Sequence, residues 1–233
     1  MRRSEDSKKT IHKLNCFFLI CGIIMAASEI WKQWCLTFRV NHGAYDWWYF
    51  PFQLCSMAMY ALLILPCVKK QRIRTLLLSF LMNYSLLGGI AVFADTSGLH
   101  YPLPALTAHS YLWHILLITI GIAAGITRLI ETEFSTLSYR DLKDSTFLYL
   151  GCCVIAGAVN QLFGCYGMIN MFYINPDFEM QQVGFAALVP VIGNVPTIVV
   201  YILATMLGAA ILFHIWRLTA CSYQHFKKKN STV

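Results

Sequence analysis

The chain begins, over residues 1–31, with MRRSEDSKKTIHKLNCFFLICGIIMAASEIW. Five basic side chains precede an apolar run at residues 14–31, and five further apolar runs follow at residues 49–68, 75–94, 104–126, 146–166 and 196–216. At ~1.5 Å per residue each run can cross a hydrocarbon core of ~30 Å, in which a helix satisfies its own backbone. The pattern predicts an all-α, polytopic membrane protein with six transmembrane helices.

The basic residues gather in alternate gaps between these runs, and this alternation predicts the orientation. Sixteen of the 18 Lys and Arg residues lie in the two terminal tails, the second gap and the fourth gap. The positive-inside rule then places both termini in the cytoplasm of a multi-pass cell-membrane protein. We divide the chain into a basic cytoplasmic tail (1–13), a six-helix membrane domain (14–216) and a second basic cytoplasmic tail (217–233).

Composition narrows the classes of partner and cofactor. The net charge of +7 would suit nucleic acid, but the basic residues flank helix ends, where anionic lipid accounts for them. We therefore expect membrane lipids as partners and no nucleic acid, with protein partners left open. The nine cysteines lack the spacing of a zinc site or a disulfide framework, so no metal or cofactor is expected. Cys35 and Cys165 both lie toward the predicted outer face and could pair there.

The fourth and fifth gaps differ in character. Residues 127–145 mix acidic and basic side chains and are typical of a solvated cytoplasmic loop. Residues 167–195 combine Asn, Pro and Gly with apolar side chains, which is too apolar for a free loop and too broken for a helix. Irregular backbone at membrane depth must be buried in protein or line a cavity. We predict an outer re-entrant or capping segment between the fifth and sixth helices.

Polar residues concentrate in the predicted outer halves of the helices, and one pair suggests chemistry. Cys55 lies four residues after Pro51 and His109 five after Pro104, so they sit ~6 and ~7.5 Å below their entry points. A thiol beside an imidazole can form a thiolate that attacks an ester carbonyl. We assign Cys55 and His109 as candidate catalytic residues for acyl transfer, although a buried cysteine is more often inert and a helical histidine more often structural.

Other outer polar residues are candidate substrate-binding groups. Gln53 projects away from Cys55, toward a neighbouring helix. Asn160 and Gln161 offer donors to an oxyanion, but interhelical hydrogen bonding is the favoured interpretation. Tyr201 belongs to a polar seam on the last helix, for which interhelical packing is again favoured. The full substrate-binding set is Gln53, Asn160, Gln161, Asn170 and Tyr201.

Several stretches resemble the YwaF-type integral membrane proteins. They are Glu29-Ile30-Trp31-Lys32-Gln33, the run Tyr49-Phe50-Pro51-Phe52-Gln53-Leu54-Cys55-Ser56, the step His109-Ser110 and residues 164–176. The resemblance extends over about residues 14–216, and Pro-Phe-Gln-Leu-Cys is its most specific part. That family is similar to the transmembrane protein 164 acyltransferases, which move fatty acyl chains between phospholipids. The resemblance implies that Cys55 accepts the acyl group and that His109 is its base.

Two other classes remain open on the sequence. The chain could be the substrate-binding subunit of a vitamin importer, for which Ala26-Ala27 and Gly208-Ala209-Ala210 offer small-residue docking surfaces. It could also be a small-solute transporter whose path is lined by Asn83, Asn160 and the seam on the last helix. A transporter usually carries polar residues through the full membrane depth, and this chain has few in its inner halves.

The charge pattern makes a direct prediction about topology. Single cysteines placed at residues 69–74 should be labelled only after the cell membrane is permeabilised. Single cysteines at residues 95–102 should be labelled in intact cells. Membrane-impermeant maleimide labelling measures both. Labelling of residues 69–74 from outside would reverse the orientation.

Overall fold

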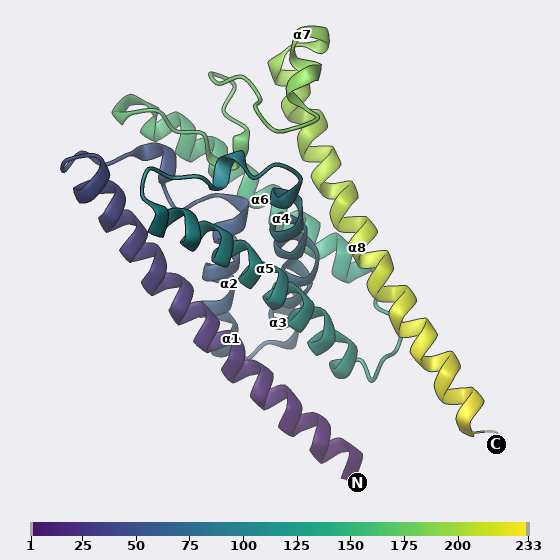
Figure 1. Ribbon diagram of the computed structural model, residues 1–233. Helices are drawn as coiled ribbons and strands as arrows, with labels where there is room; N and C mark the ends of the chain where they lie inside the picture. Colours follow the sequence, from purple (N-terminus) through teal and green to yellow (C-terminus); the bar gives the residue numbers. More distant parts are fainter. Residues whose placement is uncertain (1, 232–233) are drawn as a thin grey trace.

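The computed structural model describes residues 2–231 and the side chains of residues 9–227, and within them the protein is helical without strands. Eight α-helices form it (Figure 1). They are α1 (Arg2–Trp34), α2 (Met57–Ile64), α3 (Gln71–Phe80), α4 (Leu86–Ala91), α5 (Pro104–Glu131), α6 (Tyr139–Phe163), α7 (Val189–Ile192) and α8 (Asn194–Ser231). A π-helical stretch, Leu81–Ser85, joins α3 to α4 into one continuous rod.

Five helical stretches have the length and composition of membrane spans. They are Lys9–Val40, Gln71–Ala94, Pro104–Glu131, Tyr139–Tyr166 and Asn194–Lys227. The sixth apolar stretch is helical only over Leu54–Cys67, which at ~1.5 Å per residue rises about 21 Å. The predicted start of this helix at Tyr49 is wrong because Pro51 holds Phe50 in an extended conformation, and the chain turns helical only after Gln53.

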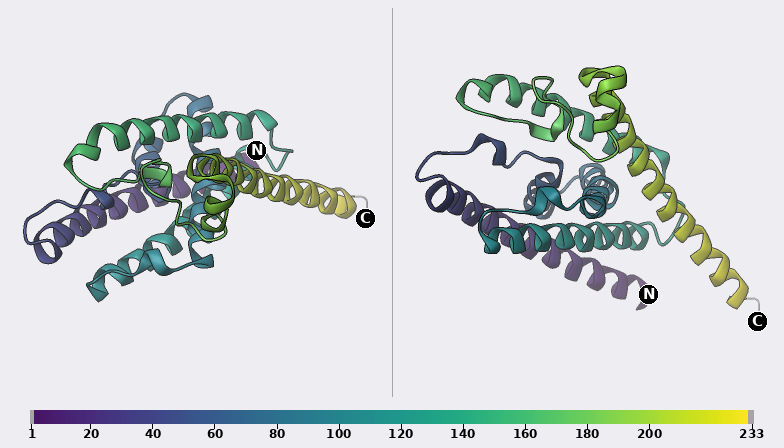
Figure 2. Two further views of the ribbon diagram at one scale, coloured as in Figure 1. Left: turned by 90° about the horizontal axis from the view of Figure 1, so that it is seen from above. Right: turned by 45° about the horizontal axis from the view of Figure 1, so that its top comes forward.

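Both chain ends lie at the same end of the bundle (Figures 1 and 2). α1 already begins at Arg2 and α8 continues to Ser231, so the predicted tails, 1–13 and 217–233, are helical wherever the structure describes them. Met1 and residues 232–233 lie outside the described residues. We call the end that holds the termini and the start of α3 the basic end. The opposite end, with Trp47, Tyr49 and Tyr101, is the aromatic end.

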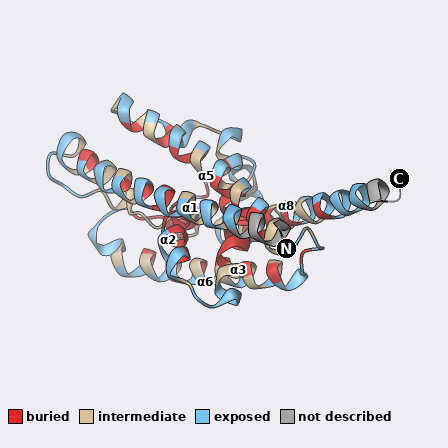
Figure 3. Ribbon diagram, turned by 90° about the horizontal axis from the view of Figure 1, so that it is seen from below, coloured by how far each residue is buried: buried red, intermediate tan, exposed pale blue. Residues whose placement is uncertain are grey.

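The outer surfaces of the helices are apolar, as lipid-facing surfaces are. The exposed side chains include Ile30 on α1, Val154 and Leu162 on α6, and Leu203 and Leu207 on α8. Figure 3 shows buried residues on the faces that meet in the middle of the bundle. An exposed apolar belt this extensive is expected only where lipid or another apolar partner replaces water. The structure is thus compatible with an integral membrane protein.

Small residues allow the closest helix contacts at the centre. A Cβ atom added to Gly121 of α5 would lie 2.6 Å from the Cβ of Leu86 at the start of α4. A Cβ added to Gly125 would lie 2.3 Å from the Trp216 ring of α8, whose indole N–H donates to the Met82 carbonyl at 3.2 Å. Glycine at these two positions therefore lets α5 serve as the central helix of the bundle.

A buried network of ion pairs ties the helices together at the basic end. Arg128 bonds to Glu131 at 3.0 Å and to Asp141 of α6 at 2.8 Å. Arg74 of α3 bonds to Glu131 at 2.6 Å and donates to Asn15 of α1 at 2.8 Å. The predicted solvated loop at residues 127–145 is therefore wrong in large part. Its charges pair across α3, α5 and α6, and the mixture of signs in the sequence could not reveal this pairing.

The network predicts unequal effects for two nearby aspartates of α6. Asp141→Asn should lower the free energy of unfolding by about 3 kcal/mol, because it leaves the buried Arg128 with one of its two partners. Asp144→Asn should change it little, since its pairs with Arg72 and Arg140 are 3.7 and 3.8 Å long and largely exposed. Thermal denaturation in detergent compares the two variants. Equal losses of stability would contradict the central role of the network.

Candidate functional site

The irregular segment after α6 is fixed by amide side chains that pair with its backbone. Gln53 donates to the Asn170 carbonyl at 2.9 Å and accepts from the Phe172 N–H at 2.8 Å. From the other side, Asn160 accepts from the Met171 N–H at 2.7 Å and donates to the Met171 carbonyl at 3.2 Å. Each amide thus pairs with the backbone as a neighbouring β-strand would. The carbonyls of Asn170 and Met171 and the N–H groups of Met171 and Phe172 therefore have hydrogen-bond partners without a helix.

Three more amides continue this arrangement toward α8. Asn170 accepts from the Asn175 N–H at 3.0 Å, and the Asn175 amide donates to the Ile169 carbonyl at 2.8 Å. Asn194, the first residue of α8, donates to the carbonyls of Pro176 and Phe178 and accepts from the Met180 N–H. Residues 169–175 of the predicted capping segment are thereby buried or half-buried against the helices, whereas most residues of its second half, 181–195, are exposed.

Two consecutive residues of this segment hold an unusual backbone conformation. Phe172 has a φ of 58° and Tyr173 a φ of 57°, in the left-handed backbone region that residues other than glycine seldom occupy. Each such residue costs on the order of 1–3 kcal/mol and persists only when its surroundings impose it. The Phe172 N–H bond to Gln53 and the burial of Phe172 supply that constraint. Strain of this kind concentrates at functional sites.

The predicted substrate-binding residues fall into two groups. Gln53, Asn160 and Asn170 come together on the backbone of residues 169–175, and their amides are engaged there. Gln161 is exposed, and Tyr201 packs its ring edge-on against Phe185 at 5.3 Å. The hydroxyls of Thr197 and Thr205, in the predicted seam of α8, donate to carbonyls four residues earlier in the chain. Thr205 also hydrogen-bonds with the Tyr149 side chain of α6, so the seam meets a neighbouring helix there.

Cys55 lies in the first turn of the short apolar helix. The hydroxyl of Ser56 and the Cys55 backbone N–H favour an anionic sulfur, whereas burial and the Glu29 carboxylate disfavour it. The first N–H groups of a helix lack carbonyl partners within it, so this end favours negative charge. Gln53 is the residue just before this helix. Its side-chain hydrogen bond to the Asn170 carbonyl holds the helix start, and so determines where the thiol lies.

A tryptophan connects Cys55 with His109. The Trp113 indole N–H donates to the Cys55 carbonyl at 3.3 Å, and the Trp113 ring lies 5.5 Å from the His109 ring. The His109 ring also lies 5.6 Å from the Trp31 ring of α1. Among the described residues none hydrogen-bonds to His109 Nε2, although this atom is buried. The imidazole therefore contacts two indoles and has no direct bond to the thiol through Nε2.

A charged pair on α1 lies beside both residues. Glu29 is buried, with Lys32 Nζ 2.8 Å from its carboxylate, and Gln33 donates to the same carboxylate at 2.7 Å. Gln33 also donates to the Tyr49 carbonyl at 2.7 Å, which joins α1 to the segment before Cys55. Both Glu29 and Lys32 act electrostatically on Cys55 and on His109. The Glu29–Lys32 ion pair is thus largely buried beside Cys55 and His109.

Sequence reasoning missed three aromatic groups and a second histidine at this site. His114 receives a fixed orientation because its Nδ1 donates to the Ser110 carbonyl at 2.8 Å, and it acts electrostatically on His109. Burial raises the pKa of Tyr173 to about 12, so its hydroxyl remains a donor at neutral pH. Trp113 carried a usable signal, since it follows His109 by four residues and thus shares its helix face. Trp31 and Tyr173 had none.

We call the group formed by Glu29, Lys32, Cys55, His109 and Trp113 the aromatic-end cluster. It combines a thiol at a helix start, an imidazole with an unpaired nitrogen and a buried ion pair. Such a set can perform nucleophilic and acid–base chemistry on an ester without a metal ligand set. No protein-family model, curated protein or solved structure matches this chain.

The amide clamps predict a sharp contrast between neighbouring residues of α6. Asn160→Ala should lower the free energy of unfolding by about 1–3 kcal/mol, because it leaves both backbone groups of the buried Met171 unpaired. Gln161→Ala, at an exposed position, should have little effect. Thermal denaturation combined with proteolysis of residues 169–180 tests this contrast. A stable, protease-resistant Asn160→Ala protein would contradict the clamp.

Proposed function

We propose that this protein is a multi-pass cell-membrane acyltransferase that moves fatty acyl chains between lipids at the outer leaflet. The observation that carries the proposal is the arrangement of Cys55 and His109 around Trp113 at the aromatic end. The resemblance to YwaF-type proteins and to the transmembrane protein 164 acyltransferases adds an expected reaction to this geometry. Under this proposal the basic end faces the cytoplasm and the aromatic end lies at the outer leaflet.

The proposed reaction has two acyl-transfer steps. The Cys55 thiol gives its proton to His109 through the bound substrate or a water molecule, and the thiolate attacks the carbonyl carbon of a lipid ester. As the carbon–oxygen ester bond breaks, the protonated His109 returns the proton to the leaving lipid alkoxide, and an acyl thioester remains on Cys55. His109 then takes a proton from the hydroxyl of the acceptor lipid, which attacks the thioester and releases the thiolate.

We assign the oxyanion formed in each step to tyrosine donors in preference to the amides. The amide groups of Asn160 are already bonded to Met171, and Gln161 is exposed. Tyr101 and Tyr173 instead lie close enough to interact electrostatically with Cys55. Burial raises the pKa of both phenols, so each is a protonated donor at neutral pH. Removal of one oxyanion donor typically costs about 100-fold or more in turnover.

One observation favours the transporter class as the second candidate. Asn83 is fully buried in the π-helical stretch between α3 and α4, and neither of its amide atoms has a partner among the described side chains. The hydroxyls of Ser79 and Ser85 are likewise buried and unpaired. Polar atoms without hydrogen-bond partners in the middle of a span cost free energy, and they often mark a path for solute or water. This candidate predicts solute uptake that depends on Asn83 and not on Cys55.

The acyltransferase proposal predicts selective reactivity of one thiol among nine. An electrophilic lipid analogue should label Cys55 in intact membranes, because nucleophilicity follows thiolate fraction and access. His109→Ala should reduce this labelling about 100-fold, the usual contribution of a general base. Cys153→Ala is the matched control and should leave labelling and acyl exchange unchanged. Mass spectrometry of the labelled peptides and an assay of acyl exchange between fluorescent lipids provide the two readouts.

Two outcomes would contradict the proposal. One is labelling spread evenly over the nine cysteines, which would show that Cys55 has no special reactivity. The other is acyl exchange that survives Cys55→Ala at normal expression. Loss of solute uptake in an Asn83→Leu variant, with Cys55→Ala unaffected, would favour the transporter.

A further inference from the structure

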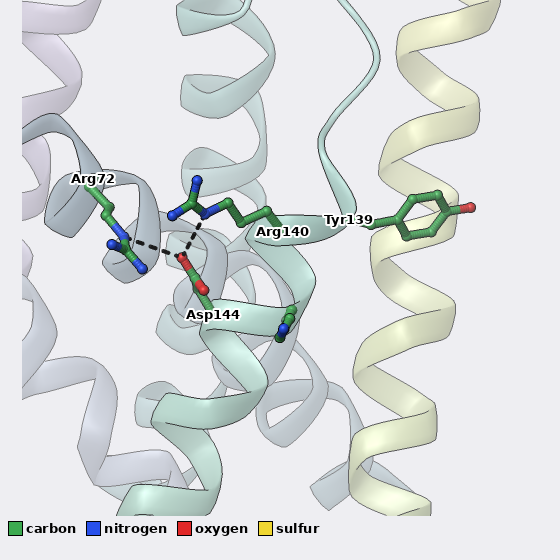
Figure 4. Close-up of a pocket in the computed structure, with 5 residues that line it drawn as sticks. Arg72, Tyr139, Arg140 and Asp144 are labelled. Atoms are coloured by element: carbon green, nitrogen blue, oxygen red, sulfur yellow. Dashed lines mark ion pairs between the residues drawn. The ribbon is translucent and has the colours of Figure 1, made fainter.

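A charged groove at the basic end lies between the starts of α3 and α6 (Figure 4). It has a volume of about 490 Å³ and is lined by Arg72, Tyr139, Arg140, Lys143 and Asp144. A second hollow of about 240 Å³ shares three of these residues and adds Gln71, Thr75, Leu76 and Asp141, whose carboxylate is paired with Arg128. We propose that this arginine groove binds the phosphate group of an anionic lipid headgroup. The inference concerns the end opposite Cys55 and does not rest on acyl transfer.

The charges of the groove leave room for an anion. Three basic side chains surround a single carboxylate, so the lining carries a net charge of +2. Asp144 lies 3.7 Å from Arg72 Nε and 3.8 Å from Arg140 Nε, and the two arginine side chains are 73% and 67% exposed. Exposed pairs at such distances are weak. The guanidinium groups therefore keep free N–H donors, which bind phosphate in a two-pronged geometry.

The backbone reinforces this preference for a phosphate. α3 begins at Gln71 and α6 at Tyr139, so the positive ends of two helices border the groove. Figure 4 shows Arg72 and Arg140 turned toward Asp144, with Tyr139 directed away toward α8. The Tyr139 ring stacks under the Arg217 guanidinium at 4.0 Å, so Tyr139 forms the wall on the α8 side. The two arginines thus converge on one position from separate helices.

The depth of the groove identifies the source of the phosphate. Gln71 and Tyr139 are also the first residues of two membrane-spanning stretches, so the groove lies where the helices leave the hydrocarbon core. Lipid phosphates occupy this level of a bilayer. The Lys143 ammonium lies 5.8 Å from the Phe147 ring and so combines an apolar stem with a charged tip, as side chains at this level do. A lipid headgroup fits this position better than a soluble phosphate.

The test measures lipid binding to the full-length protein in neutral detergent by native mass spectrometry. The probes are phosphatidylglycerol, diacylglycerol with the same chains, and inorganic phosphate as a competitor. We expect binding of phosphatidylglycerol in preference to diacylglycerol. Arg72→Gln combined with Arg140→Gln should weaken this binding roughly fivefold for each arginine removed. Lys69→Gln combined with Lys70→Gln removes the same charge from exposed residues outside the groove and is the matched control.

Asp144→Asn should change the affinity for phosphatidylglycerol in the opposite direction. This variant tests the proposal even if the double arginine variant does not fold. Removing the carboxylate that now lies between the arginines should strengthen phosphatidylglycerol binding, since no competing anion remains in the groove. Equal weakening by the arginine and lysine pairs, or no gain with Asp144→Asn, would overturn the groove as the site. Displacement of the lipid by inorganic phosphate at comparable concentration would overturn the lipid headgroup as its ligand.

Discussion

The demand that every backbone polar group find a partner at membrane depth determines how this protein is built. Helices meet this demand internally, and most of the chain is helical. Two of the non-helical segments, the break before Leu54 and residues 169–180, use side-chain amides as backbone partners. Gln53 joins these two segments, because it precedes the Cys55 helix and bonds to the strained Phe172. The position of Cys55 follows from this bond.

The two ends of the bundle are stabilised by different chemistry. At the basic end, ion pairs among Arg74, Arg128, Glu131 and Asp141 connect three helices beneath an exposed basic surface. At the aromatic end, hydrogen bonds from side-chain amides and contacts between aromatic rings fix an irregular backbone around a buried ion pair. The second arrangement holds a thiol and an imidazole half-buried among aromatic rings. The first arrangement offers donors to anions at the surface.

Five of the six predicted spans correspond to helices long and apolar enough to cross a membrane, because apolar length is a local property of the sequence. The sequence could not show that Asn160 pairs with the backbone of residue 171, since any neighbouring helix would satisfy an amide equally well. The helix start after Gln53 was missed because apolar residues continue unchanged through Pro51. Burial of Arg128 and Asp141 depends on which helices adjoin, and the charge pattern alone contains no such information. The roles of Cys55 and His109 stay predictions.

The most direct measurement of the central claim is the mass of the Cys55 peptide from protein isolated out of its own membrane. An acyl-transferring Cys55 should carry a fatty acyl thioester, visible as added mass that neutral hydroxylamine removes. The same peptide from a His109→Ala protein should lack it, because the base that drives thioester formation is gone. Lipid acyl exchange that proceeds while the Cys55 thiol stays unmodified, with its thioester never detected, would contradict the account.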